Sequence, residues 1–157
     1  MSEKTMSFHY GKHHKGYVDN YNKLAEKAKK AFYQGDSKKV SSLKKSLNFN
    51  LGGHLNHEFF WENLASTSDG GGQVPAAGSE LYESIKSDFG SVDKFISQFT
   101  EMATSVFGSG WCWLLYNKEK RNLEIQTTAN QDRFDDDSSL VPLMNVDVWE
   151  HAYYLDF

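Results

Sequence analysis

The sequence contains one cysteine, two prolines and no long apolar run. Because Cys112 stands alone, no disulfide can form within the chain, which favours a reducing, intracellular setting. No apolar stretch approaches the length of a membrane span, and the first residues lack the charged-then-apolar order of a signal peptide. We therefore expect an intracellular protein of the cytoplasm or the mitochondrial matrix, with no membrane partner.

Acidic residues are scarce in the first part of the chain, and basic residues are scarce in the rest. Residues 1–57 hold 11 of the 17 basic side chains and have a net charge of about +7, while the remainder has about −11. These lysines come without arginines, so nucleic acid is not a favoured partner. We interpret most of them as solvated helix faces.

Apolar residues at steps of three and four predict two helices in the first third of the chain. One stripe runs from Tyr17 to Ala31, and a second runs from Val40 to Trp61. Gly35-Asp36-Ser37 between them is a helix stop followed by a new N-cap, which predicts a helical hairpin. Gly52-Gly53 inside the second helix is costly there, so another segment should pack very close to it.

A segment rich in Ser, Gly and Pro separates this hairpin from a second part of different character. Two further helical patterns follow it, then an unbroken apolar strand at 111–116, an alternating strand at 123–127 and a third candidate strand at 140–148. We predict an α+β fold with an N-terminal helical hairpin (1–65), a linker (66–78) and a C-terminal α/β part (79–157). The C-terminal part would contain a small antiparallel sheet of about three strands, with an exposed acidic loop at 135–137.

The histidines are the residues most suited to chemistry. They form three clusters: His9, His13 and His14; His54 and His57; and His151. Three pairs have a spacing that can place both side chains on one helix face: His9 with His13, His54 with His57, and Asp147 with His151. Imidazole and carboxylate suit manganese, iron or zinc. A single helical histidine is more often a hydrogen-bonded core or surface residue, and the spacing does not tell which member of the first two pairs turns inward.

Four stretches resemble, in the same order, motifs of the iron/manganese superoxide dismutase family. They are FHYGKHH at 8–14, NHEFFW at 56–61, GSGWCWL at 108–114 and DVWEHAYY at 147–154. The resemblance extends over essentially all 157 residues. It implies that superoxide is disproportionated to oxygen and hydrogen peroxide at a mononuclear metal site. Zinc is then excluded, because the ion must alternate between M(III) and M(II).

The resemblance also implies a ligand set. His9, His57, Asp147 and His151 would bind the metal together with one solvent molecule, which leaves His13, His14 and His54 outside the set. The cofactor would be one manganese ion per subunit, with iron as the alternative. The manganese type is favoured because the active-site glutamine is Gln131 of the second part, while Gly53 stands at the corresponding position of the first. Tyr10-Gly11 and Phe107 resemble the iron type.

Further roles follow from the same resemblance. Gln131 would hydrogen-bond the bound solvent, and Tyr17 would stand at the substrate entrance beside His13. Glu150 of one subunit would reach across a dimer interface to His151 of the other, and Tyr154 would approach the other subunit's His13. A homodimer is therefore expected, and a tetramer is the alternative.

The chain departs from the family pattern at both ends. The family has a segment before the first helix and further helices after the Tyr-Tyr motif, so we expect a chain truncated at both ends, with an incomplete C-terminal part. The rival hypothesis is a truncated, non-catalytic relative that binds metal without turnover. A zinc hydrolase is disfavoured, because it would need a general base where the pattern offers Gln131 and Tyr17.

Overall fold

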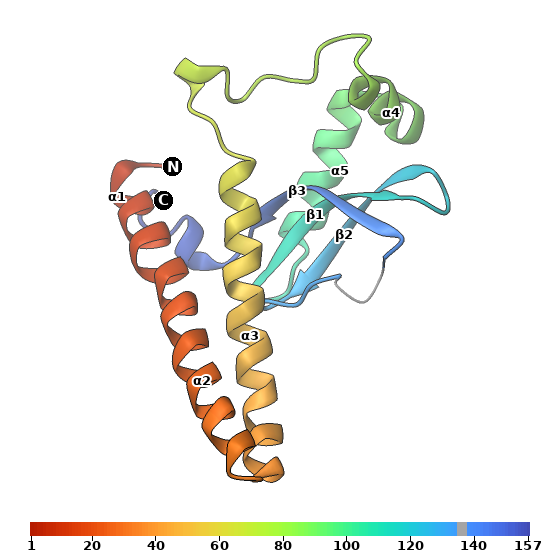
Figure 1. The fold of residues 1–157 in the computed structure, drawn as a ribbon. Coiled ribbons are helices and arrows are strands. Elements are labelled where there is room, and N and C mark those ends of the chain that lie inside the picture. The colour runs from red at the N-terminus through yellow and green to blue at the C-terminus, as the bar shows by residue number, and fades with distance from the viewer. Residues whose placement is uncertain (135–137) are drawn as a thin grey trace.

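A long helical hairpin forms the N-terminal part of the computed structural model, which describes residues 1–134 and 138–157. The acidic loop predicted at 135–137 lies outside the described residues. Helix α1 (Glu3–Phe8) continues through the π-helix η1 (His9–His14) into α2 (Lys15–Tyr33), and α3 (Ser37–Glu62) packs along α2 (Figure 1). The predicted hairpin is therefore confirmed.

The turn of the hairpin has the chemistry that its sequence indicates. Gly35 adopts a positive φ of 70°, a conformation that costs glycine little. The carboxylate of Asp36 then accepts a hydrogen bond from the Lys39 backbone N–H at 2.9 Å and so caps α3. The end of α2 and the start of α3 are thus both set by neighbouring residues, which explains why this boundary is predictable.

The π-helix is a feature that apolar periodicity did not predict. A π-turn pairs residues five apart, and such turns are often found at functional sites. Here it spans the whole first histidine cluster, from His9 to His14, and both of these residues are buried.

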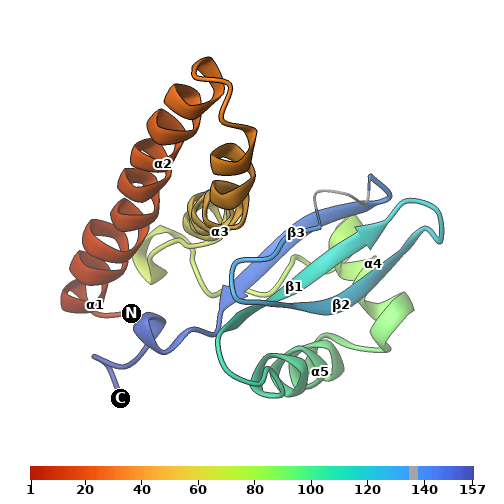
Figure 2. The ribbon, with the colours of Figure 1, turned by 90° about the horizontal axis from the view of Figure 1, so that it is seen from below.

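The C-terminal part is a three-stranded antiparallel sheet with helices against one face. Its strands are β1 (Gly110–Asn117), β2 (Asn122–Ala129) and β3 (Leu140–Asp147), in the order β2-β1-β3. Helices α4 (Glu80–Phe89) and α5 (Val92–Thr104) cover one face, and the hairpin lies on the other side (Figure 2). This confirms the predicted α+β class.

The central strand is buried on both faces, which explains its unbroken apolar run. Cys112 and Leu114 pack with α4 and α5 in one core cluster, while Trp111, Trp113 and Leu115 pack with Phe60 of α3 in the other. Successive side chains of a strand point to opposite faces, so a strand between two layers needs apolar residues at every position. The second cluster joins the sheet to the hairpin beside the candidate site.

Two short 3₁₀ helices complete the described elements: η2 (Thr67–Asp69) in the segment between α3 and α4, and η3 (Glu150–Ala152) after β3. Asp156 ties the segment after η3 to α1. It accepts hydrogen bonds from the Ser2 backbone N–H at 2.9 Å and from the Thr5 hydroxyl at 2.8 Å. The Ser2 side chain, the Ser2 backbone and Thr5, in that order, lower the pKa of Asp156 to about 2. Within the described ranges, no helix combines the length and apolar character needed to cross a bilayer.

Candidate metal centre

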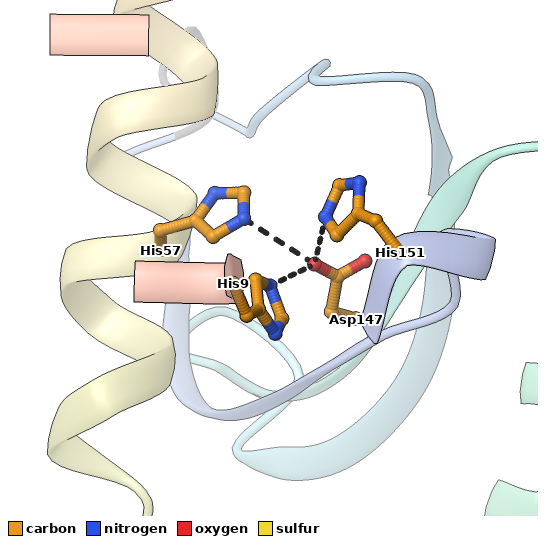
Figure 3. Close-up of side chains that lie close together, drawn as sticks. All are labelled: His9, His57, Asp147 and His151. Carbon is orange, nitrogen blue, oxygen red and sulfur yellow. Dashed lines mark hydrogen bonds and ion pairs between the residues drawn. The ribbon is translucent and has the colours of Figure 1, made fainter. Parts of the chain in front are cut away.

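Four side chains that could ligate a metal meet between the hairpin and the sheet. His9 begins the π-helix, His57 lies on α3, Asp147 ends β3 and His151 lies in η3. All four are buried, and their ligand atoms lie within 4.8 Å of one another (Figure 3). The structure therefore gathers donor atoms from four separate elements into one buried cluster.

Three imidazole nitrogens converge on a single carboxylate oxygen. The Nε2 atoms of His9, His151 and His57 lie 3.0, 3.1 and 3.4 Å from Oδ2 of Asp147. A first-row ion with nitrogen and oxygen ligands at about 2.1 Å separates neighbouring ligand atoms by about 3.0 to 3.4 Å. The spacing of the cluster therefore fits one small ion.

The hydrogen bonds of His57 show that the cluster fits a cation. Its Nδ1–H donates to the carbonyl oxygen of Gly53 at 2.6 Å, so the neutral ring carries a lone pair on Nε2. That lone pair faces the Asp147 carboxylate, and Nε2 is a buried nitrogen without a hydrogen-bond partner in the part of the chain that the structure describes. Burial lowers the pKa of His57 to about 3, so a proton does not relieve this repulsion near neutral pH. A metal ion would relieve it.

Asp147 is held as an ionised carboxylate. Burial opposes its ionisation, but hydrogen bonds from His151 and His9 outweigh burial and keep the pKa of Asp147 below its ordinary value. Its second oxygen, Oδ1, accepts a hydrogen bond from the Trp149 backbone N–H at 2.9 Å. The site therefore combines one anionic donor with three imidazoles.

The other histidines surround the four without belonging to the cluster. His13 stacks on His151 with ring centroids 4.3 Å apart, and burial, with a smaller contribution from His151, lowers the pKa of His13. His14 stacks on His57 and bonds to His54. Burial is also the largest cause that lowers the pKa of His14.

Gln131 and Tyr17 form a hydrogen-bonded pair beside His57. The Gln131 amide N–H donates to the Tyr17 hydroxyl oxygen at 3.1 Å, and the Tyr17 ring lies 5.3 Å from that of His57. The amide oxygen of Gln131 accepts from the Trp111 indole at 3.0 Å and from Asn56 at 3.2 Å. The orientation of the Gln131 amide is therefore fixed at both ends.

A turn after β2 delivers Gln131 to this position. Asn130 adopts a positive φ of 53°, which asparagine tolerates better than most residues. Its backbone is tied down on both sides, because its N–H donates to Ser109 and its carbonyl accepts from the Trp149 indole. The Gln131 carbonyl oxygen then lies against Gly52 of α3, where an added Cβ would be only 2.1 Å away. The close approach predicted at Gly52-Gly53 is thus confirmed, and an added Cβ at Gly53 would meet the Tyr17 ring at 2.5 Å.

Aromatic rings close the cluster, and polar residues near it reach the surface. Trp111 sets its edge against His57 at 5.0 Å, and Trp149 stacks on His151 at 5.4 Å. Glu150, next to His151, is exposed, and Tyr154 is 45% exposed. The two residues expected to face another subunit therefore lie at the surface of the chain.

Sequence reasoning assigned no role to Asn56. This residue is fully buried, donates to Gln131 and accepts from Arg133 at 3.2 Å, while its backbone carbonyl accepts from Asn145. Asn56 thus joins α3 to two segments of the C-terminal part. The only available signal was its place directly before His57, because a polar residue beside a ligand often orients neighbouring groups.

Comparison with known proteins gives matches along the whole chain. The family profile described as "Iron/manganese superoxide dismutases, alpha-hairpin domain" matches residues 1–65, and the profile for the C-terminal domain of the same enzymes matches residues 77–157. "Superoxide dismutase [Fe]" of Tetrahymena pyriformis is 44% identical over 157 residues, which cover all of this chain and 80% of that protein. "Superoxide dismutase [Mn] 1, mitochondrial" of Arabidopsis thaliana is 45% identical, with 68% of its length covered, and the mitochondrial manganese enzyme of Onchocerca volvulus is 41% identical, with 69% covered.

Proposed function

The chain belongs to the iron/manganese superoxide dismutase family, and we propose that it disproportionates superoxide at one metal ion held by His9, His57, Asp147 and His151. One observation carries the ligand assignment: three imidazole nitrogens point at one buried carboxylate oxygen, and one of them has its lone pair there. An iron or manganese ion held by these four residues would supply one-electron redox chemistry, by which one superoxide is oxidised to oxygen and a second is reduced and takes up two protons to give hydrogen peroxide.

Relatives of both metal types match this chain, and we propose manganese as the resident ion, with iron as the alternative. The proposal is supported by the origin of the active-site glutamine. Gln131 comes from the C-terminal part and lies next to α3, where Gly53 has no side chain that could take its place.

Solvent would supply the protons of peroxide through hydrogen-bonded groups near the opening, and we propose that Tyr17 stands at this substrate entrance in contact with Gln131. Burial raises the pKa of Tyr17 to about 12, so its hydroxyl keeps its proton at working pH. Because that oxygen accepts a hydrogen bond from Gln131, the O–H hydrogen can turn toward a bound anion. Gln131 would orient both Tyr17 and the metal-bound solvent, and His13 would support the entrance through its stacking on His151.

We propose that two copies pair through the surface around η3, with a tetramer as the alternative. Glu150 would reach His151 of the other subunit, and Tyr154 would approach the other subunit's His13. The exposure of both residues supports this arrangement. Sedimentation velocity of the purified chain is expected to give a dimer, and Glu150→Ala should shift the mass toward monomer. Equal masses for the two proteins would contradict the interface.

We also propose an intracellular location, in the cytoplasm or the mitochondrial matrix. The lone cysteine supports it, and several relatives are named as mitochondrial. We further propose that the chain divides into a hairpin (1–65), a linker (66–78) and a C-terminal part (79–157). The matched profiles support this division, because the hairpin profile ends at residue 65 and the C-terminal profile begins at residue 77.

The experiment that tests the proposed function is superoxide dismutation by the purified chain, loaded separately with manganese and with iron. Turnover with manganese alone is expected, and turnover with both ions would mean that the site tolerates either. No turnover in samples shown to contain each metal would favour the rival, a relative that binds metal without catalysis.

The role proposed for Gln131 predicts that its replacement lowers turnover without loss of the metal. Gln131→Ala should keep the metal, because the four proposed ligands are unchanged, but it removes the donor to Tyr17 and the acceptor for the Trp111 indole. We expect metal content equal to that of the unchanged chain, a shifted reduction potential and turnover lowered by about 10- to 100-fold, the usual cost of losing an outer partner. Unchanged turnover and potential would refute the assignment.

A further inference from the structure

His14 is a buried histidine that the proposed reaction does not use. It is 9% exposed and is the last residue of the π-helix. Its ring lies nearly parallel to that of His57, with centroids 5.4 Å apart and 15° between the planes. His14 therefore covers one flat face of a proposed ligand.

Both ring nitrogens of His14 are engaged. The Trp61 indole N–H lies 2.9 Å from Nδ1, and Nδ1 of His54 lies 2.9 Å from Nε2. An indole nitrogen can only donate, so Nδ1 of His14 must be an acceptor and its proton must lie on Nε2. That proton is then donated to Nδ1 of His54. The hydrogen bonds therefore assign one tautomer to each of the two imidazoles.

The π-helix explains how two residues of one short segment reach the site. In an α-helix, residues five apart differ by about 140° around the axis, so His9 and His14 would face different directions. The wider π-turn brings residues five apart onto one face. Here His9 enters the cluster, while His13 and His14 each stack on another member of it, His151 and His57.

We infer that His14 is a positioning residue, which is clamped by Trp61 and His54 and holds the plane of the His57 imidazole. The bond from Nδ1 of His57 to Gly53 fixes one edge of that ring, but the ring can still tilt about the bond. The flat face of His14 opposes this tilt and keeps Nε2 of His57 directed at the Asp147 carboxylate. The inference rests on the ligand role proposed above for His57.

Two substitutions at His54 test the clamp without touching the cluster. In His54→Asn the side-chain oxygen can occupy the position of Nδ1 and accept from His14, whereas His54→Leu removes the acceptor. Nitrogen-15 NMR of the metal-free chain should show His14 with its proton on Nε2 in the unchanged protein and in His54→Asn. In His54→Leu, the ring resonances of both His14 and His57 should shift.

Titration with Mn²⁺ supplies the second readout. His54→Leu should bind about tenfold more weakly, as for the loss of an outer partner, while His54→Asn should bind like the unchanged chain. His14→Phe, which keeps a flat ring but has no hydrogen bonds, should weaken binding in the same direction, and it replaces His54→Leu if that variant does not fold. His57 resonances that stay in place in these variants, or a His14 proton on Nδ1, would overturn the inference. Failure of the unchanged chain to bind manganese or iron would instead refute the proposed function, because the NMR result does not depend on metal.

Discussion

Asp147→Asn is expected to abolish both metal binding and dismutation. Asparagine has nearly the same shape as aspartate but no charge, and the charge is what distinguishes this site from three imidazoles alone. Oδ2 of Asp147 is also the atom on which the three Nε2 atoms converge. We expect affinity for manganese to fall by more than about 100-fold, beyond the cost of losing an outer partner. Competition titration and metal analysis measure this loss, and turnover should disappear with the metal.

Thermal unfolding gives an independent view of the same variant. A ligand that binds only the folded chain stabilises it by about 2.7 kcal/mol when its concentration is 100 times its dissociation constant. Manganese should therefore raise the melting temperature of the unchanged chain and leave that of Asp147→Asn where it is. Asp93→Asn is the matched control, because Asp93 is an exposed residue in the first turn of α5. A variant at Asp147 that kept one metal ion per chain would contradict the ligand assignment.

The fold was largely predictable because its boundaries depend on local chemistry. Gly35 and Asp36 end one helix and cap the next, and the Ser91 hydroxyl oxygen caps α5 by accepting a hydrogen bond from the Lys94 backbone N–H. The apolar run of β1 follows from its burial between two layers. Each of these signals lies within a few residues of the element that it sets.

The site was less predictable from spacing, since its first histidine cluster does not follow the α-helical period. The π-helix changes which residues share a face, so a spacing of four could not decide between His9 and His13. The structure shows His9 among the four clustered residues and His13 stacked on His151. The motif resemblance supplied the choice that periodicity left open.

Contacts between distant parts of the chain were beyond sequence reasoning. Asn56 bonds to Gln131, 75 residues away, and Asn145 bonds to the Asn56 backbone across 89 residues. Such bonds depend on how the sheet packs against α3, and no local pattern carries that information. The two glycines of α3 were a partial exception. Glycine is costly in a helix interior, so these residues indicated that another segment packs close to α3, but not which segment it is.

That close neighbour makes Gly52→Ala the second large prediction. The new Cβ would lie 2.1 Å from the Gln131 carbonyl oxygen and 3.2 Å from its carbonyl carbon. Both are backbone atoms, so the clash cannot be relieved by turning a side chain, and α3 and the turn after β2 must separate. Overpacking of this kind costs about 1–3 kcal/mol of stability. The separation should also pull the Gln131 amide away from Tyr17 and lower turnover, although no proposed ligand is altered.

Alanine at Gly16 should change the stability of the protein in the opposite direction. Gly16 lies in α2, and nothing lies within 4 Å of the position of an added Cβ. Alanine restricts the unfolded chain there and suits a helix better, so Gly16→Ala should stabilise the protein by about 0.5–1 kcal/mol. Urea unfolding of both variants measures the two changes against one reference. Because both substitutions add one methyl group to a helical glycine, helix propensity alone predicts gains of the same sign. Only the packing of α3 against the Gln131 turn predicts that Gly52→Ala loses stability, and a stabilised Gly52→Ala with full turnover would mean that these two segments do not meet in solution.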